Sequence, residues 1–108
     1  MKLLGKLAIQ NRKLTNYLLV YQDKDDKSEF LASAGYTLEN WHVLRQDILR
    51  SVEATPVAEV IQTEWGIRLK VRSQLAGCIG KSLRVVTIWQ QDQGTDTIRL
   101  LTLYPDKL

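Results

Sequence analysis

The sequence predicts an α+β fold, with two to three N-terminal helices packed on a four-stranded antiparallel β-meander. After Pro56 the spacing of apolar residues changes from the helical repeat of about 3.6 residues to the strand repeat of about two. Short turns join the strand-like runs, as they join antiparallel neighbours. We expect the 108 residues to form a single domain, 1–108, mainly helical over 1–55 and sheet over 56–108.

Two short helices are expected in the first third of the chain. Asn11 can cap a helix over residues 12–20, whose apolar side chains recur at three- and four-residue spacing. After a charged loop, residues 27–34 are expected to turn helical beyond Asp26. Gly35 can then take the left-handed conformation that ends many helices.

The strongest helical pattern covers residues 38–54. Thr37 can accept hydrogen bonds from the N–H groups of the first turn. Pro56 ends the helix, because the residue before a proline is pushed to extended geometry. One stripe of this helix is apolar and is expected to be buried: Trp41, Leu44, Ile48 and Val52.

Four strands are expected in the second half, over residues 57–65, 67–76, 82–91 and 97–105. In the second of these, apolar side chains alternate with Arg68, Lys70 and Arg72, so that one face is apolar and the other basic.

The last two strands carry apolar residues on both faces by strict alternation. In the final strand, Ile98 and Leu100 are assigned to one face and Leu101 and Leu103 to the other. Both faces are therefore expected to be covered, one by helices and the other by a partner or dimer surface.

The turn between the second and third strands contains Gly-Lys-Ser, the ending of a phosphate-binding loop. The loop motif requires a glycine where this chain has Leu75, and a helix where this chain has the β-branched run that follows Ser82. We therefore expect a hairpin turn without nucleotide affinity.

Net charge, cysteine content and the length of apolar runs limit the class of protein. Fifteen basic and twelve acidic residues give a net charge of +3, which suits RNA, DNA or an acidic partner. The lone Cys78 cannot form an internal disulfide. No apolar run is long enough for a leader or a membrane span, so a cytoplasmic protein without membrane contact is expected.

Isolated polar residues give weak signals for chemistry. His42 is interpreted as a surface or packed histidine rather than a general base. The acidic run 23–26 is interpreted as a charged loop in which Asp26 caps a helix, in preference to a weak cation site. We therefore expect no metal and no cofactor.

The basic sheet face is the most suggestive cluster. Arginines on a rigid sheet can clamp phosphates, and aromatic rings such as Trp65 and Tyr104 can stack on bases. The alternative is a solvated face whose charges discourage edge pairing. The residues expected to bind nucleic acid are Lys70, Arg72, Arg84 and Trp89.

Several stretches also carry a family resemblance over nearly the whole chain: KLTNYLL, DKSEFLASAGYTLENWHVL, EWGIRLKV, LRVVTIW and RLLTLYP. They resemble a family of small bacterial domains of unknown function that is abundant in cyanobacteria. The shared positions are Lys27, 30–36, Trp65 with Gly66 and Arg68, Trp89, and Arg99 with Thr102, Tyr104 and Pro105. Many relatives carry His-Pro ahead of the lysine, where this chain has YQDKDD.

Related domains are similar to the superfamily that groups barnase, EndoU, the tRNA-cutting colicins and the RelE-type toxins (BECR). Those proteins are metal-independent ribonucleases that use the RNA 2′-hydroxyl as nucleophile. The resemblance implies that Arg68 and Arg99 hold the scissile phosphate and that Lys27 approaches from the helical side. It also implies that a hydroxyl orients the phosphate, from Thr87, Thr102 or Tyr104.

Two functions remain open from the sequence. One is a ribonuclease-like toxin that acts on RNA and is held by a small antitoxin protein. The other is a non-catalytic protein-binding or dimerisation module, which would use the same sheet face for a partner or for a second copy of the chain.

Overall fold

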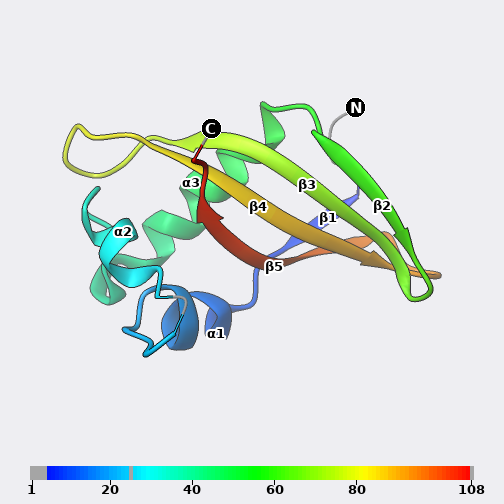
Figure 1. Ribbon diagram of the computed structural model, residues 1–108, viewed down its shortest axis with the longest axis horizontal. Coiled ribbons are helices and arrows are strands. Elements are labelled where there is room, and N and C mark those ends of the chain that lie inside the picture. Colours follow the sequence, from blue (N-terminus) through cyan, green and yellow to red (C-terminus); the bar gives the residue numbers. More distant parts are fainter. Residues whose placement is uncertain (1–4, 25, 108) are drawn as a thin grey trace.

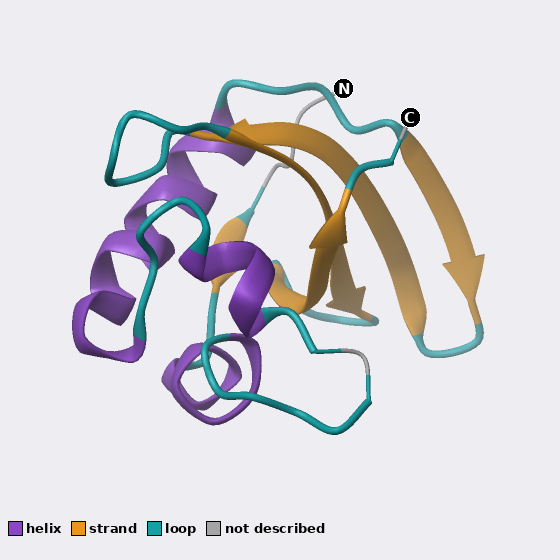
Figure 2. Ribbon diagram, turned by 60° about the vertical axis from the view of Figure 1, so that its left-hand side comes forward, coloured by secondary structure: helices purple, strands orange, loops and turns teal. Residues whose placement is uncertain are grey.

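The α+β fold is confirmed by the computed structural model, which describes residues 5–24 and 26–107 (Figure 1). The helical segments are α1 (Asn11–Lys13), the π-helical η1 (Leu14–Leu18), α2 (Ser28–Ala32), the 3₁₀ turn η2 (Leu38–Asn40) and α3 (Trp41–Glu53). The strands are β1 (Lys6–Ala8), β2 (Glu59–Thr63), β3 (Gly66–Leu75), β4 (Leu83–Asp92) and β5 (Thr97–Pro105). Figure 2 shows the helices together on one side of the sheet.

The sheet has five strands in the order β1-β5-β4-β3-β2. The four expected strands form the antiparallel meander, while β1 pairs with β5 in parallel and places Lys6 opposite Thr97. The predicted four-stranded sheet is therefore corrected to a mixed sheet of five. A strand of three residues is too short to show a two-residue alternation, so no sequence pattern indicated β1.

The first helix differs from its prediction at both ends. Asn11 is the first helical residue rather than the cap, and its predecessor Gln10 makes no capping side-chain bond. The helix passes into the π-helical turn η1, in which Leu14 and Leu18 are fully buried. The helical character of this segment and its apolar face were thus correctly predicted, whereas its bounds and its π-helical turn were not.

The second helix begins as predicted. The Asp26 carboxylate accepts hydrogen bonds from the N–H groups of Ser28 (3.3 Å) and Glu29 (3.4 Å) at the start of α2. A bond of 2.7 Å from the Ser28 hydroxyl lowers the pKa of Asp26, and backbone donors add to this effect. Asp26 is thus a helix cap, because its charge satisfies first-turn donors.

The long helix packs against the core side of the sheet. Its entry is tied by the Thr37 N–H, which donates to the Asn40 side chain (2.8 Å). Leu44, Ile48 and Val52 are fully buried as predicted, whereas Trp41 is only half-buried and packs at the margin of the core.

A β-bulge in β5 corrects the predicted faces of the last strand. Trp89 pairs with Leu100 and its neighbour Ile88 pairs with Thr102, so Leu101 has no partner on β4. The extra residue shifts the alternation by one position. Ile98, Leu100 and Leu103 are consequently all buried in the same core, and they do not divide between two faces.

The Gly-Lys-Ser segment lies in a hairpin connection, as predicted, with Leu75 paired to Leu83 across it. Gly77 has a φ of +82°, and a Cβ at this position would clash with the carbonyl of Lys81. The Gly77 N–H donates to the Tyr36 hydroxyl (2.8 Å), and the Cys78 N–H donates to the Ala34 carbonyl (2.7 Å). These two donors are used within the fold, which argues against a phosphate cradle here.

Replacing Leu44 with alanine is expected to lower the free energy of unfolding by about 2 to 5 kcal/mol, because the variant leaves a cavity between α3 and the sheet. Denaturant unfolding measures the change. Leu38→Ala is the matched control, since this leucine is 47% exposed. Equal losses in the two variants would contradict the placement of Leu44 in the core.

Tyr36 joins the helical layer to the hairpin, because its hydroxyl also donates to Asp47 (2.5 Å). Tyr36→Phe should lower the free energy of unfolding by about 1 to 3 kcal/mol, since it leaves a part-buried N–H without its acceptor. The exposed Tyr21, replaced in the same way, should show almost no change.

The free energies of unfolding of wild type and of Tyr36→Phe should also depend differently on pH. Burial, followed by the hydrogen bond to Asp47, raises the pKa of Tyr36. The stability that comes from neutral Tyr36 is complete below the ordinary tyrosine pKa of about 10 and is lost as the pH rises further. The difference in the free energy of unfolding between wild type and Tyr36→Phe should therefore become smaller above a pH of about 10. A difference that does not change with pH would contradict this assignment.

Candidate functional site

The face of the sheet opposite the helices, here called the open face, carries three cross-strand rows. Each row contains one residue from β3, one from β4 and one from β5, aligned by the strand register. The rows are Arg68–Gln90–Arg99 (row one), Lys70–Ile88–Thr102 (row two) and Arg72–Val86–Tyr104 (row three). Every β3 member is basic, as the sequence predicted for this face.

The bulge at Leu101 determines which β5 residues belong to the open face. By strict alternation Arg99 would point away from Thr102 and Tyr104. The extra residue reverses the alternation, and all three share the face with the β3 cations. Three of the four β5 positions that the resemblance singled out, Arg99, Thr102 and Tyr104, are therefore brought to one surface.

An open pocket of about 620 Å³ lies over row three. The loop before α2 and the end of β5 complete its wall. Its lining residues are Asp26, Lys27, Lys70, Arg72, Val86, Tyr104, Pro105, Asp106 and Lys107. Four cations and two carboxylates thus surround it, so the pocket favours an anion.

Two cations of the pocket are held in place by neighbours. Arg72 pairs with Asp106 at 2.8 Å, and the Asp106 side chain is only 7% exposed. The Lys27 ammonium donates to the Tyr17 hydroxyl (3.1 Å) and lies 5.4 Å from the centre of that ring. Lys27 is therefore carried to the edge of the open face from the helical side, by a contact with η1.

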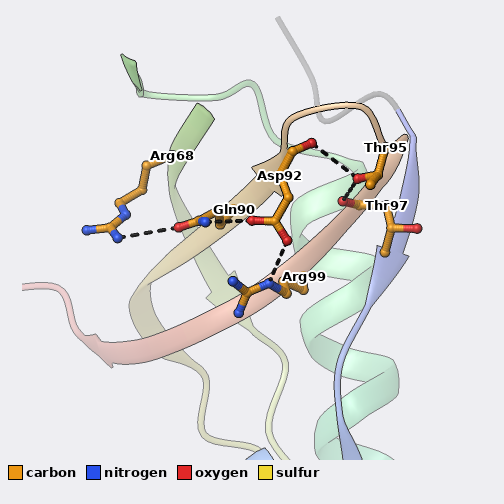
Figure 3. A network of polar contacts seen from close by, with 6 residues as sticks. All are labelled: Arg68, Gln90, Asp92, Thr95, Thr97 and Arg99. Atoms are coloured by element: carbon orange, nitrogen blue, oxygen red, sulfur yellow. Dashed lines mark hydrogen bonds and ion pairs between the residues drawn. The ribbon is translucent and has the colours of Figure 1, made fainter. Parts of the chain in front are cut away.

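A polar network organises row one (Figure 3). Arg68 donates to the side-chain oxygen of Gln90, Oε1 (3.4 Å), and the side-chain Nε2 of Gln90 donates to Asp92 (2.7 Å). Arg99 pairs with the other oxygen of Asp92 at 3.4 Å. The Gln90 bond lowers the pKa of Asp92, and Arg99 lowers it further. The network orients two guanidinium groups on one side of the sheet.

Arg84 lies at the hairpin end of the sheet, paired with Gln74. With Arg72 it lines a smaller pocket of about 400 Å³, and Arg72 and Asp106 line both this pocket and the larger one. Arg84 thus extends the basic surface beyond row three.

The predicted role of Trp89 is corrected. Its side chain is fully buried, and its indole N–H donates to Thr87 (2.8 Å), which is also buried. Neither residue reaches the open face, since odd positions of β4 point into the core. Trp65 is 67% exposed and remains an aromatic ring that a base can reach.

The predicted catalytic residues therefore fall into two groups. Lys27 and Tyr104 line the pocket with Lys70 and Arg72, whereas Arg68 and Arg99 lie in row one and do not line it. Thr102 lies between them in row two.

The sequence analysis did not predict Gln90, although the alternation of β4 would have placed it beside Arg68. It also did not predict Asp106, whose position depends on the fold.

Other reactive groups lie away from the open face or form no cluster. His42 is exposed on α3 with its ring against Trp41. Desolvation raises the pKa of the Cys78 thiol, and the Asp47 charge adds to this, which disfavours a thiolate. Within residues 5–24 and 26–107, no group of three or more histidine, cysteine, aspartate or glutamate side chains is placed to hold a metal ion.

Comparison with protein families gives one match. The model of a domain of unknown function, DUF6883, covers residues 2–107. The chain belongs to this family. Comparisons with curated proteins and with solved structures find no match. The family match confirms the resemblance to a domain of unknown function and carries no link to the BECR nucleases. In the described part of this DUF6883 domain, no helix is long and apolar enough to cross a membrane.

Titration of Asp92 tests the row-one network. The carboxyl resonance should titrate below the ordinary aspartate range, and Gln90→Ala should raise the pKa of Asp92 more than Arg99→Ala does, because the amide bond is the larger cause. NMR titration of labelled carboxyl groups measures both shifts. A pKa that neither substitution moves would contradict the network.

Proposed function

We propose that this DUF6883 domain binds RNA on its open face and acts as a ribonuclease-like protein, with one phosphodiester held in the pocket over row three. The observation that carries the proposal is the register of the sheet. It aligns the three β3 cations with the residues of β5, beside a pocket lined by four cations.

The physical case rests on geometry more than on net charge. Strand residues two positions apart on β3 repeat at about 6.6 Å on one face, which gives an evenly spaced line of cations. Arginine offers planar two-pronged donors to a phosphate, and lysine offers a compact charge. Tyr104 supplies a hydroxyl and an aromatic ring at the pocket wall.

Cleavage in this proposal follows the metal-independent route. The RNA 2′-oxygen forms a bond to the adjacent phosphorus, the bond from phosphorus to the 5′-oxygen breaks, and a 2′,3′-cyclic phosphate and a 5′-hydroxyl result. Lys27 and Arg72 lie where they can stabilise the charge of the phosphorane, and Tyr104 can orient the phosphate. Solvent water in the open pocket accepts the 2′ proton, Asp106 keeps Arg72 in position through their ion pair, and the leaving 5′-oxygen takes a proton from Lys27.

Such an enzyme needs control in the cell, so the proposal includes a small antitoxin protein that covers the open face. Its expected chemistry is acidic, because the surface that it covers is basic.

RNA binding is tested by fluorescence anisotropy with a labelled single strand at low and moderate salt. Lys70→Ala should weaken binding by about tenfold if one phosphate contact is lost, and should reduce the salt slope by roughly one unit. Lys81→Ala removes the same charge from the hairpin connection and should bind like wild type. A wild type that binds no RNA at low salt would end the proposal.

Cleavage is tested on the same RNA in the presence of EDTA, with products separated by size and checked for the cyclic phosphate end. Lys27→Ala, Tyr104→Phe and Asp106→Asn should each slow cleavage while circular dichroism stays unchanged. If the protein binds RNA but never cuts it, the RNA-binding part of the proposal stands and the ribonuclease activity is wrong.

A second candidate function is supported by the other edge of the sheet. In the described chain β2 pairs only with β3, and Val60, Ile61 and Trp65 near this edge are 46%, 43% and 67% exposed. An exposed apolar edge strand suits a protein partner or a second copy of the chain. Light scattering across a concentration series separates a homodimer from a monomer that binds RNA.

A further inference from the structure

The open face has two separate places where an anion can bind. The first is the pocket over row three, and the second is row one, where Arg68 and Arg99 flank Gln90. Val86 and Gln90 mark these two rows on β4 and are four residues apart. At about 3.3 Å per residue the rows lie about 13 Å from each other. A single phosphate cannot contact both, so a ligand that uses both must carry phosphates at a distance from one another.

We infer that the surface between the two places is a shallow trough, because the side chains of β4 are more deeply buried than those of its neighbours on this face. β4 forms its floor, with Val86 and Gln90 buried and Ile88 half-buried. The long β3 cations form one wall, and the β5 members of the rows form the other. Neighbouring strands lie about 4.8 Å apart, so the walls rise from backbones only about 10 Å apart. That width suits one nucleic-acid strand and excludes a duplex lying in the trough.

Row one keeps donors available for a phosphate. Arg68 uses one terminal nitrogen on Gln90, and Arg99 uses Nε on Asp92. A guanidinium carries five N–H donors, so each arginine retains others. The Arg99 side chain is 43% exposed. Because Asp92 and Gln90 hold the two groups in orientation, a phosphate meets donors that are already positioned.

We propose that row one is a second phosphate subsite, and that the ligand of the open face is an extended single-stranded oligonucleotide that runs along β4 from the pocket to Arg68 and Arg99. This inference rests on the proposed RNA binding and adds the strandedness, the direction and the minimum extent of the ligand. The half-buried Ile88 of row two provides an apolar surface for the sugar or base between the two phosphates.

The test compares RNA ligands of different length by competition against a labelled hexanucleotide. A dinucleoside monophosphate has a single phosphate and can fill only one subsite, whereas the hexanucleotide can fill both. Wild type should bind the hexanucleotide at least tenfold more tightly than the short ligand. Arg68→Ala and Arg99→Ala should remove most of this gain and leave the affinity for the short ligand within about twofold.

Controls separate the subsite from general charge and from misfolding. Arg50→Ala removes one positive charge from the exposed surface of α3. This variant should keep the full gain in affinity between the short ligand and the hexanucleotide. Arg68→Lys keeps the charge but loses the two-pronged donor, and should keep only part of the gain. Thermal unfolding of each variant confirms the fold.

Each outcome has one meaning. If wild type binds neither ligand, both the proposed function and this inference are wrong. If it binds RNA but shows no gain with length, or if the arginine variants weaken the short ligand as much as the long one, row one is not a separate subsite and the proposed function stands. Equal affinity for a duplex and a single strand of the same length would contradict the inference that the open face selects a single strand.

Discussion

The β-bulge at Leu101 is the constraint on which both faces of the sheet depend. An unbroken alternation along β5 would bury Leu100 but send Leu103 to the opposite face. One unpaired residue lets both leucines enter the core. The same shift brings Arg99 to the open face together with Tyr104. A single local irregularity thus completes the core and assembles the candidate site, and neither can be moved without the other.

The two sides of the sheet have different physical tasks. On the core side, apolar burial against α3 supplies the main stabilisation, with Trp89 fully enclosed and its one polar atom satisfied by Thr87. On the open side, the same strands present charges at regular spacing. Because the core fixes the backbone, side chains on the open face need little reorganisation to meet an anion, which favours affinity. Tyr36 contributes from a distance, since it ties the hairpin that connects β3 and β4 to the helical layer.

The electrostatics of the open face are tuned by three acidic groups. Asp92 and Asp106 each form an ion pair with one arginine of the site. Each pair holds its arginine in one orientation and neutralises part of the arginine's charge. Asp26 acts differently: it caps α2 and thereby places the adjacent Lys27 at the pocket. Lys27, Arg72 and Arg99 therefore have fixed positions on a positive surface.

The sequence by itself determined the α+β class, the four meander strands and the basic stripe of β3, because residue periodicity and turn chemistry are local properties. Only the tertiary structure decided the rest. β1 is too short to show a pattern, and its parallel pairing with β5 joins residues distant in the chain. The bulge depends on which β5 side chains the core accepts. Trp89 shows the same limit, since alternation cannot say which face of a strand the helices will cover. Lys27 and Tyr104 meet at one pocket only because the loop before α2 folds to the edge of β5.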